Sequence, residues 1–283
     1  MTDGTSVSIL LSKPKDVYQP LVDDDDEPAS ASGSISTSTS AIPFTPVGNL
    51  ENYHRFGLDP GRENVFVTVD RDERKVSLSL KEYYSRTGVS NRQKWEQGRL
   101  ARSALGPFLS SLPSRNCSTL EGFRAYLSAL RPSLPRILAF YGSPKWRNAA
   151  FRCYYLRQKL LHDVCHQFRK TGKQTVVFFG AARFNLSSRG HPSTTPLALI
   201  RRELSRFPGV TVIPIDEFRT SQICSKCMTR MGGPSPFGSW RLKACPHCRT
   251  VWDRDVNAAR NILYLGDRMD ANAGARPEPF CRG

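Results

Sequence analysis

The sequence predicts an α/β protein built on a mixed sheet, with an antiparallel edge, parallel later strands and flanking helices. Three observations support this class. Short strand-like runs separated by turns come first, a long helical stretch follows, and two continuous apolar runs then alternate with helices. Such alternation is typical of a sheet with parallel strands, whereas strands joined by short turns pair antiparallel.

The first strands are expected over residues 56–59, 65–70 and 75–80. The turn sequences DPGRE and RDERK separate these runs, which predicts a small antiparallel meander. Residues 81–170 are expected to be mainly helical, and Thr119 and Glu121 resemble a helix start in TLEGFRAYLSAL.

The later strands are expected in the apolar runs QTVVFFGAARF and GVTVIPIDEF, which read as buried parallel strands. The sequence PLALIRRELSRF predicts a helix between them. The last helix is expected in RDVNAARNILYLG and is predicted to end at Gly266, because glycine commonly ends helices.

Charge is distributed unevenly along the chain. Residues 1–45 have a net charge of −5, and residues 46–283 have +21. A body this basic indicates a polyanionic partner, most simply nucleic acid, although a solvated basic surface is the alternative. No apolar run approaches the roughly 20 residues of a membrane span, and no signal peptide is evident, so no membrane partner is expected.

Four of the eight cysteines follow the pattern Cys224-x2-Cys227-x17-Cys245-x2-Cys248. This spacing matches tetrathiolate zinc sites, in which each Cys-x-x-Cys turn offers two sulfurs to one ion. A closed four-thiolate site predicts structural zinc, which would replace the core that the excursion between the turns lacks. The alternative is unrelated or disulfide-bonded cysteines. Core thiols are expected at Cys117, Cys153 and Cys165.

Acidic side chains stand at the ends of predicted elements: Asp59, Asp216 and Glu217 after strands, and Asp253 and Asp255 at the last helix. Sites in open α/β sheets form beyond the carboxyl ends of strands. Three carboxylates there would suit two Mg²⁺ ions about 3.5–4 Å apart that hydrolyse a phosphodiester. Each acid also has a structural alternative, a turn or a helix cap.

The segments GLDPGRENVFVTVD, TSQICSKC…CPHC and DRDVNAARNIL together resemble the RuvC nuclease domain and embedded zinc ribbon of TnpB/Fanzor proteins, relatives of type V CRISPR effectors. The resemblance covers about residues 50–266. It implies an RNase H-like fold, catalytic Mg²⁺ and RNA-guided DNA cleavage with a transposon-derived guide RNA. It carries the first catalytic acid onto Asp59 and the third onto Asp255.

The second acid departs from the bacterial pattern, because no acid stands near Phe179 or Gly180 at the end of the fourth strand. Either the site is inactive, or Glu217 on the fifth strand supplies the carboxylate, as the resemblance to Fanzor proteins implies. Adjacent strands lie about 4.8 Å apart, and Gly180 leaves room for a side chain to cross. We prefer Glu217 to Asp216 because its side chain is longer.

Arginine and lysine interleave with aromatic residues between positions 131 and 170, where cations can neutralise phosphates and rings can stack on bases. Some of these aromatics, Phe151 and Tyr155 among them, could instead belong to the core. The cysteine segment is basic too. The nucleic-acid-binding candidates are Arg136, Lys145, Arg147, Arg152, Arg157, Lys159, Arg219, Lys226, Arg241, Lys243 and Arg254.

The resemblance also implies an N-terminal wedge and recognition region, for which residues 1–48 offer no counterpart, so we expect an N-terminally truncated chain. The alternative functions are an inactive nucleic-acid-binding remnant or regulator and an unguided RuvC-like DNA nuclease. A eukaryotic Fanzor-like protein would act in the nucleus, and otherwise the cytoplasm is expected. The expected organisation is a disordered segment 1–48, a RuvC-like domain in 49–222 and 251–266, a zinc ribbon 223–250 and a flexible tail 267–283.

Overall fold

The computed structural model describes residues 44–169, 172–181, 196–232 and 238–282. Nearly all of the segment expected to be disordered therefore lies outside the described residues. The chain divides into two compact units, and the described part of the smaller one is residues 96–142. The larger unit holds the sheet, the cysteine pattern and the last helix.

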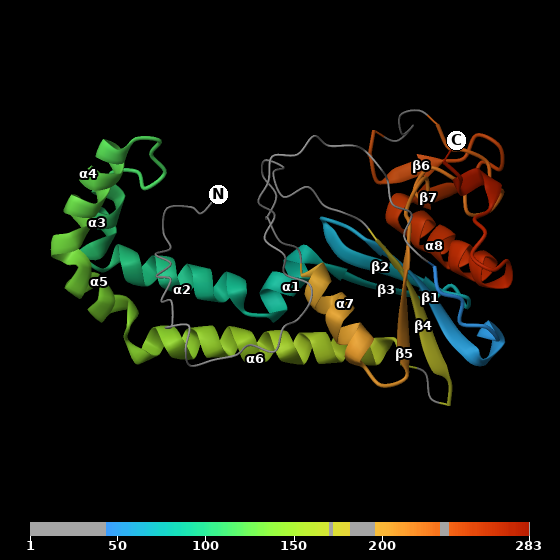
Figure 1. The fold of residues 1–283 in the computed structure, drawn as a ribbon, viewed down its shortest axis with the longest axis horizontal. Coiled ribbons are helices and arrows are strands. Elements are labelled where there is room, and N and C mark those ends of the chain that lie inside the picture. Colours follow the sequence, from blue (N-terminus) through green and yellow to red (C-terminus); the bar gives the residue numbers. More distant parts are fainter. Residues whose placement is uncertain (1–43, 170–171, 182–195, 233–237, 283) are drawn as a thin grey trace. The chain divides into compact units, whose positions relative to one another are not determined.

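The sheet of the larger unit has the strand order β3-β2-β1-β4-β5 (Figure 1). The first three strands pair antiparallel, whereas β1, β4 and β5 run parallel, which confirms the predicted mixed sheet. A separate hairpin, β6 and β7, follows the first cysteine pair. The bounds are β1 Tyr53–Pro60, β2 Asn64–Asp70, β3 Lys75–Ser79, β4 Gln174–Gly180, β5 Val210–Ile215, β6 Leu242–Ala244 and β7 Val251–Asp253.

The middle of the chain is helical, as predicted. Thr119 caps α4, because its side chain accepts a hydrogen bond from the Gly122 amide at 3.2 Å. The α-helices are α1 Leu80–Arg86, α2 Val89–Ala101, α3 Leu105–Ser111, α4 Leu120–Leu130, α5 Leu134–Tyr141, α6 Pro144–Gln167, α7 Leu197–Arg206 and α8 Arg254–Ala271. Short 3₁₀ turns are η1 Leu50–Asn52, η2 Arg131–Ser133 and η3 Glu278–Phe280.

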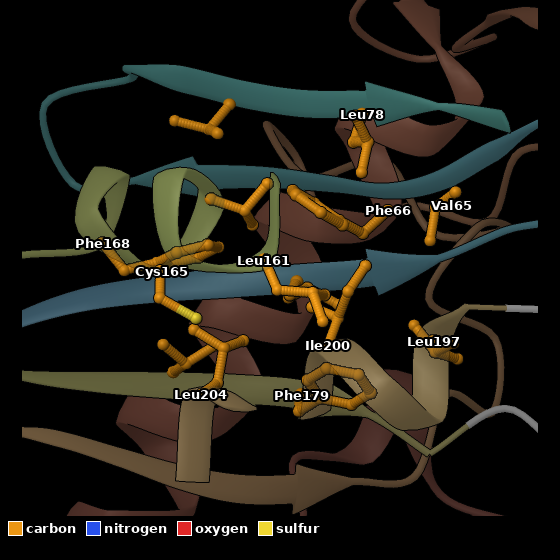
Figure 2. Packing of buried hydrophobic residues seen from close by; sticks show 14 of the residues in the cluster. Val65, Phe66, Leu78, Leu161, Cys165, Phe168, Phe179, Leu197, Ile200 and Leu204 are labelled. Carbon is orange, nitrogen blue, oxygen red and sulfur yellow. The ribbon is translucent and has the colours of Figure 1, made fainter. Parts of the chain in front are cut away.

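Successive strand residues point to opposite faces of the sheet. Both faces carry apolar side chains, and helices cover both. On one face, Phe179 and the β1–β3 side chains pack against α6 and α7 (Figure 2). On the other face, Val176 and Phe178 pack against α8. The continuous apolar run of β4 thus reflects a strand that is buried on both sides. The second run, predicted to be a buried strand as well, forms the edge strand β5, in which Thr211 is exposed.

The last helix differs from its prediction, since α8 continues past Gly266 to Ala271. A Cβ at Gly266 would collide with the ring of Phe178. The glycine therefore permits close packing of helix on sheet and does not end the helix. Sequence alone cannot separate these two uses of glycine.

Gly266→Ala is expected to destabilise the protein by about 1–3 kcal/mol, although alanine normally favours a helix interior. The added methyl would overlap Phe178. Urea denaturation measures the effect. Gly98→Ala in α2 is the control, because a Cβ there meets only the far end of Arg102 at 3.8 Å. A stabilised Gly266→Ala variant would contradict this packing role.

The described part of the predicted flexible tail, residues 267–282, is not simply flexible. These residues begin as helix, and Phe280 is fully buried against the face of the sheet that α8 covers. Of the predicted core thiols, Cys165 is buried, whereas Cys117 and Cys153 are half-buried. Among the described residues, no helix is long and apolar enough to cross a membrane.

Candidate functional site

Three carboxylates from distant parts of the chain meet in one cleft of about 600 Å³. The register pairs Leu58 with Phe179 and Gly180 with Ile215, so β1, β4 and β5 end at the same edge of the sheet. Asp59, Glu217 and Asp255 all line the cleft. Glu63, Trp240 and Arg254 line the same cleft.

Two acids at the start of α8 have different roles. Asp253 is the N-cap, and its Oδ1 accepts hydrogen bonds from the amides of Asp255 and Val256 at 3.0 and 3.1 Å. The carboxylate of Asp255 therefore does not cap the helix. It lines the cleft instead, where Asn64 Nδ2 donates to its Oδ2 at 3.1 Å.

Glu217 reaches across the end of β4. A Cβ on Gly180 would collide with Glu217 Oε1 and would lie 2.8 Å from Glu217 Cδ. The carboxylate of Glu217 thus occupies the space that a side chain at position 180 would need. This is the crossing that the sequence predicted.

Asp216, the neighbouring acid, is engaged elsewhere. Its carboxylate accepts hydrogen bonds from Arg282 Nη2 at 2.9 and 3.1 Å and lies 3.7 Å from Arg276 Nη1. It also accepts a hydrogen bond from the Phe218 amide. Asp216 does not line the carboxylate cleft. The two adjacent acids therefore have different surroundings: the Asp216 carboxylate contacts arginines, whereas Glu217 lines the cleft.

The cleft is electrostatically costly without a cation. Burial, followed by the nearby carboxylates of Glu217 and Asp255, raises the pKa of Asp59 well above its usual value, and Arg254 opposes this only in part. Carboxylate oxygens are the ligands that Mg²⁺ and Ca²⁺ prefer. These residues can therefore hold a divalent cation, which would relieve the repulsion.

The four cysteines form a tighter cluster, with sulfur atoms all within 4.8 Å of one another. Cys224 Sγ lies 3.6 Å from Cys248 Sγ, and Cys227 Sγ lies 3.4 Å from Cys245 Sγ. In a tetrahedral site with Zn–S bonds of about 2.3 Å, neighbouring sulfur atoms lie about 3.8 Å apart. The cluster thus fits one metal ion. Within the described residues, the three cleft carboxylates do not approach one another so closely.

Both Cys-x-x-Cys turns have the same backbone geometry. The Cys224 amide donates to the Thr229 carbonyl and its own carbonyl accepts from Met228, while Cys245 bonds in the same way to Thr250 and Arg249. Met228 and Arg249 have φ of 59° and 55°, values uncommon for residues other than glycine. The two turns therefore have the same backbone conformation, and both direct their cysteine sulfurs toward one cluster. In addition, Trp252 Nε1 donates to Cys224 Sγ at 3.2 Å.

Two buried asparagines of α8 hold the loop between Glu217 and the first cysteine. Asn257 Nδ2 donates to the carbonyls of Thr220 and Ile223, and so does Asn261 Nδ2, at 2.7–3.3 Å. Asn257 Oδ1 also accepts from the Ser225 amide at 2.9 Å. The sequence reasoning missed both, although asparagines four apart on an otherwise apolar helix face were a usable signal.

Asn257→Ala and Asn261→Ala are each expected to lower the free energy of unfolding by about 1–3 kcal/mol. The loss should be larger for Asn257→Ala. Asn257 uses both ends of its amide, whereas Asn261 Oδ1 has no partner among the described residues. Because each residue covers the same two carbonyls, the double variant should lose more than the sum of the single losses. Chemical denaturation of the three variants tests this, and additive losses would contradict the shared role.

Arg276 is a second residue that the sequence reasoning missed. Its guanidinium donates to the carbonyls of Asp216, Phe218 and Phe280 at 2.8, 3.1 and 2.7 Å. These contacts fix the backbone on both sides of Glu217. Burial lowers the pKa of Arg276, yet it stays charged at neutral pH, since arginine has such a high intrinsic value.

The predicted basic residues fall into three groups. Arg136 is exposed on α5 in the smaller unit, and Lys145, Arg147, Arg152 and Lys159 are exposed on α6. Near the cleft, Arg241 pairs with Glu63 at 2.7 Å, and Arg254 lies over the Trp240 ring. The remaining candidates are Arg157 over Tyr154, Arg219 over Phe218, exposed Lys226, and Lys243, which donates to the Ser221 carbonyl.

Aromatic side chains on α6 are unusually exposed. Phe151, Tyr154 and Tyr155 are 69, 51 and 59% exposed. The core alternative is therefore wrong for Phe151 and Tyr155, whereas Trp146 on the same helix is buried. Exposed rings among cations are typical of surfaces that stack nucleobases.

Comparison with known families matches residues 203–262 to the Cas12f1-like TNB domain. The TnpB-like proteins L79 and L770 of Acanthamoeba polyphaga mimivirus are each 36% identical to this chain over 58 residues. The matched segment is 20% of this chain and only 10% of either relative. The family-model match, residues 203–262, contains Glu217, the four cysteines and Asp255.

Two solved structures resemble the chain weakly. A Cas12f1–sgRNA–target DNA complex has a TM-score of 0.41 at 15% identity, covering 74% of this chain and 49% of that one. CasPhi-2 (Cas12j) bound to crRNA and phosphorothioate-DNA has a TM-score of 0.45 at 11% identity, covering 80% and 46%.

Proposed function

We propose that this chain is an RNA-guided, divalent-metal-dependent DNA endonuclease of transposon origin. Support comes from the match of residues 203–262 to the Cas12f1-like TNB domain and from the similarity to TnpB-like proteins. The observation that carries the proposal is the meeting of Asp59 with Glu217 and Asp255, two residues of the matched segment, in one cleft. A decayed remnant would have no requirement to keep three acids from separate segments together.

Each cleft residue has a distinct task in this proposal. Asp59, Glu217 and Asp255 hold the catalytic cations, which we expect to be Mg²⁺. When bound there, Mg²⁺ would supply an activated water and would stabilise the leaving oxygen of a phosphodiester. Asn64 orients Asp255 through its hydrogen bond. Arg254 at the rim contacts a phosphate and keeps the bound strand over the carboxylates.

The cysteine cluster is proposed to hold structural zinc. Four sulfur ligands leave no open position for substrate, and soft thiolates favour zinc over magnesium. The cluster and Trp252 form the small core of this segment. Zinc would thereby fix the loop that joins Glu217 to Cys224, and so connect the structural metal to the geometry of the cleft.

The nucleic-acid partners are proposed to be a guide RNA and its target DNA. The support is the exposed cations and rings of α6 together with the basic cysteine segment. Cations neutralise backbone phosphates without reading sequence, as guide–target duplexes are held in guided nucleases.

The test is cleavage of single- and double-stranded DNA by purified protein with Mg²⁺, with and without co-purified RNA. We expect RNA- and Mg²⁺-dependent cleavage that Asp59→Asn removes. Cleavage without RNA would favour an unguided nuclease. Tight binding without cleavage under every condition would instead favour the non-catalytic remnant or regulator.

A further inference from the structure

A second cleft, of about 540 Å³, lies between the α1–α2 segment and the first half of α6, away from the carboxylates. It is formed by one face of each helix. Asn91, Arg92 and Trp95 line it from α2, and Lys145, Asn148 and Arg152 line it from α6 at helical spacing. The size is within the usual 300–1,000 Å³ or so of small-ligand sites.

The chemistry of this cleft suits an anion that carries a flat ring. Three lining residues are cations, and none of the described residues that line it is acidic. Asn91, Asn148, Lys145 and Arg152 form no side-chain hydrogen bond or ion pair with the rest of the described chain. Their polar groups are available to a ligand.

The ring surface comes from Trp95, which lines the cleft and packs edge-on against Trp146, with ring centroids 4.9 Å apart. Trp146 is buried, so the pair is anchored in the protein. Gly88, Cys153 and Leu156 also line the cleft, and a Cβ at Gly88 would lie 3.0 Å from Leu156 Cδ1.

We propose that this cleft binds one unstacked nucleotide of a nucleic-acid strand. Lys145 and Arg152 take its phosphate through charge-assisted hydrogen bonds, and Trp95 stacks on its base. The amides of Asn91 and Asn148 can both donate to and accept from a base edge. This inference rests on the proposed function, because it requires a nucleic-acid partner. It adds the place at which one nucleotide of that partner binds.

Cys153 provides a direct readout, because it is half-buried and lines the cleft. The wild-type protein is alkylated with N-ethylmaleimide while short single-stranded RNA or DNA is titrated, and each cysteine is followed by peptide mass spectrometry. An oligonucleotide at about ten times its Kd should slow Cys153 alkylation about tenfold, because only empty protein reacts. Cys117, which is half-buried in the smaller unit, should react at an unchanged rate.

A matched pair of variants separates the cleft from general charge. Arg152→Gln should weaken oligonucleotide binding by about five- to tenfold, because a charge-assisted phosphate contact is lost. Lys94→Gln removes the same charge from an exposed position of α2 outside the cleft, and should change binding by less than about twofold.

If nucleic acid binds while Cys153 stays fully reactive, or if both variants weaken binding equally, the cleft proposal is overturned and the proposed function stands. Protection by a polyglutamate peptide but by no oligonucleotide also overturns it, in favour of an acidic protein. Absence of any nucleic-acid binding by the wild type overturns both. Comparing RNA with DNA shows which strand supplies the nucleotide.

Discussion

Glu217→Gln is expected to lower the Mg²⁺-dependent cleavage rate by about a thousandfold or more. Glutamine keeps the shape of the side chain but removes the charge that would hold a cation, and several kcal/mol of transition-state stabilisation depend on it. The side chain stands in the space next to Gly180, at the end of β4. Single-turnover cleavage at saturating Mg²⁺ measures the rate. Mn²⁺ binding followed by electron paramagnetic resonance gives a readout that does not require cleavage.

Asp216→Asn is the matched control one residue away, and we expect it to keep the rate within about threefold. Asparagine can still accept a hydrogen bond from Arg282, and Asp216 lies outside the carboxylate cleft. An active Glu217→Gln protein together with an inactive Asp216→Asn protein would show that we have chosen the wrong acid. Gly180→Ala, which forces Glu217 aside, should behave like Glu217→Gln if the crossing matters.

Cys245→Ser is expected to remove the structural metal and unfold the segment around the cysteines. Structural zinc contributes about 10–16 kcal/mol in small zinc peptides, far more than packing supplies here. The core of this segment is a handful of residues, chiefly the cysteines, Met231 and Trp252. Mass spectrometry measures the metal content, and limited proteolysis measures the unfolding of the segment that follows Cys224.

Cys117→Ser is the control, because Cys117 is half-buried and lies outside the cluster. It should keep full metal content and the proteolysis pattern of the wild type. Equal metal content in the Cys245→Ser protein would contradict a four-thiolate site. Zinc, rather than another thiophilic ion, should be the metal that purified protein carries.

Much of the architecture could be predicted from the sequence. A strand that is buried on both sides must be continuously apolar, so the run that forms β4 could be recognised in the sequence. The run that forms β5 was also recognised as a strand, but β5 lies at the edge of the sheet and its Thr211 is exposed. The spacing of the cysteines also predicted their cluster. The end of α8 could not be predicted in this way, because Gly266 is explained by the Phe178 ring, which is distant in sequence.

The candidate carboxylates could be named from motifs, but the groups that position them could not. Which of Asp253 and Asp255 caps α8 depends on backbone geometry. The hydrogen bonds of Asn257 and Asn261 to the loop after Glu217 join residues more than 30 positions apart. Long-range polar contacts leave no periodic trace in a sequence, whereas burial does.

The bonds of Arg276 and Arg282 to residues 216–218 have a practical consequence for anyone who purifies this protein. Most of the residues between α8 and Arg276 are exposed, and Ala273 and Gly274 have φ of 48° and 88°. Such a link is a natural target for proteases. One cut there would release the brace behind Glu217 and leave every residue of the cleft in place. The intact mass of a preparation should therefore be checked before an inactive sample is taken to mean an inactive enzyme.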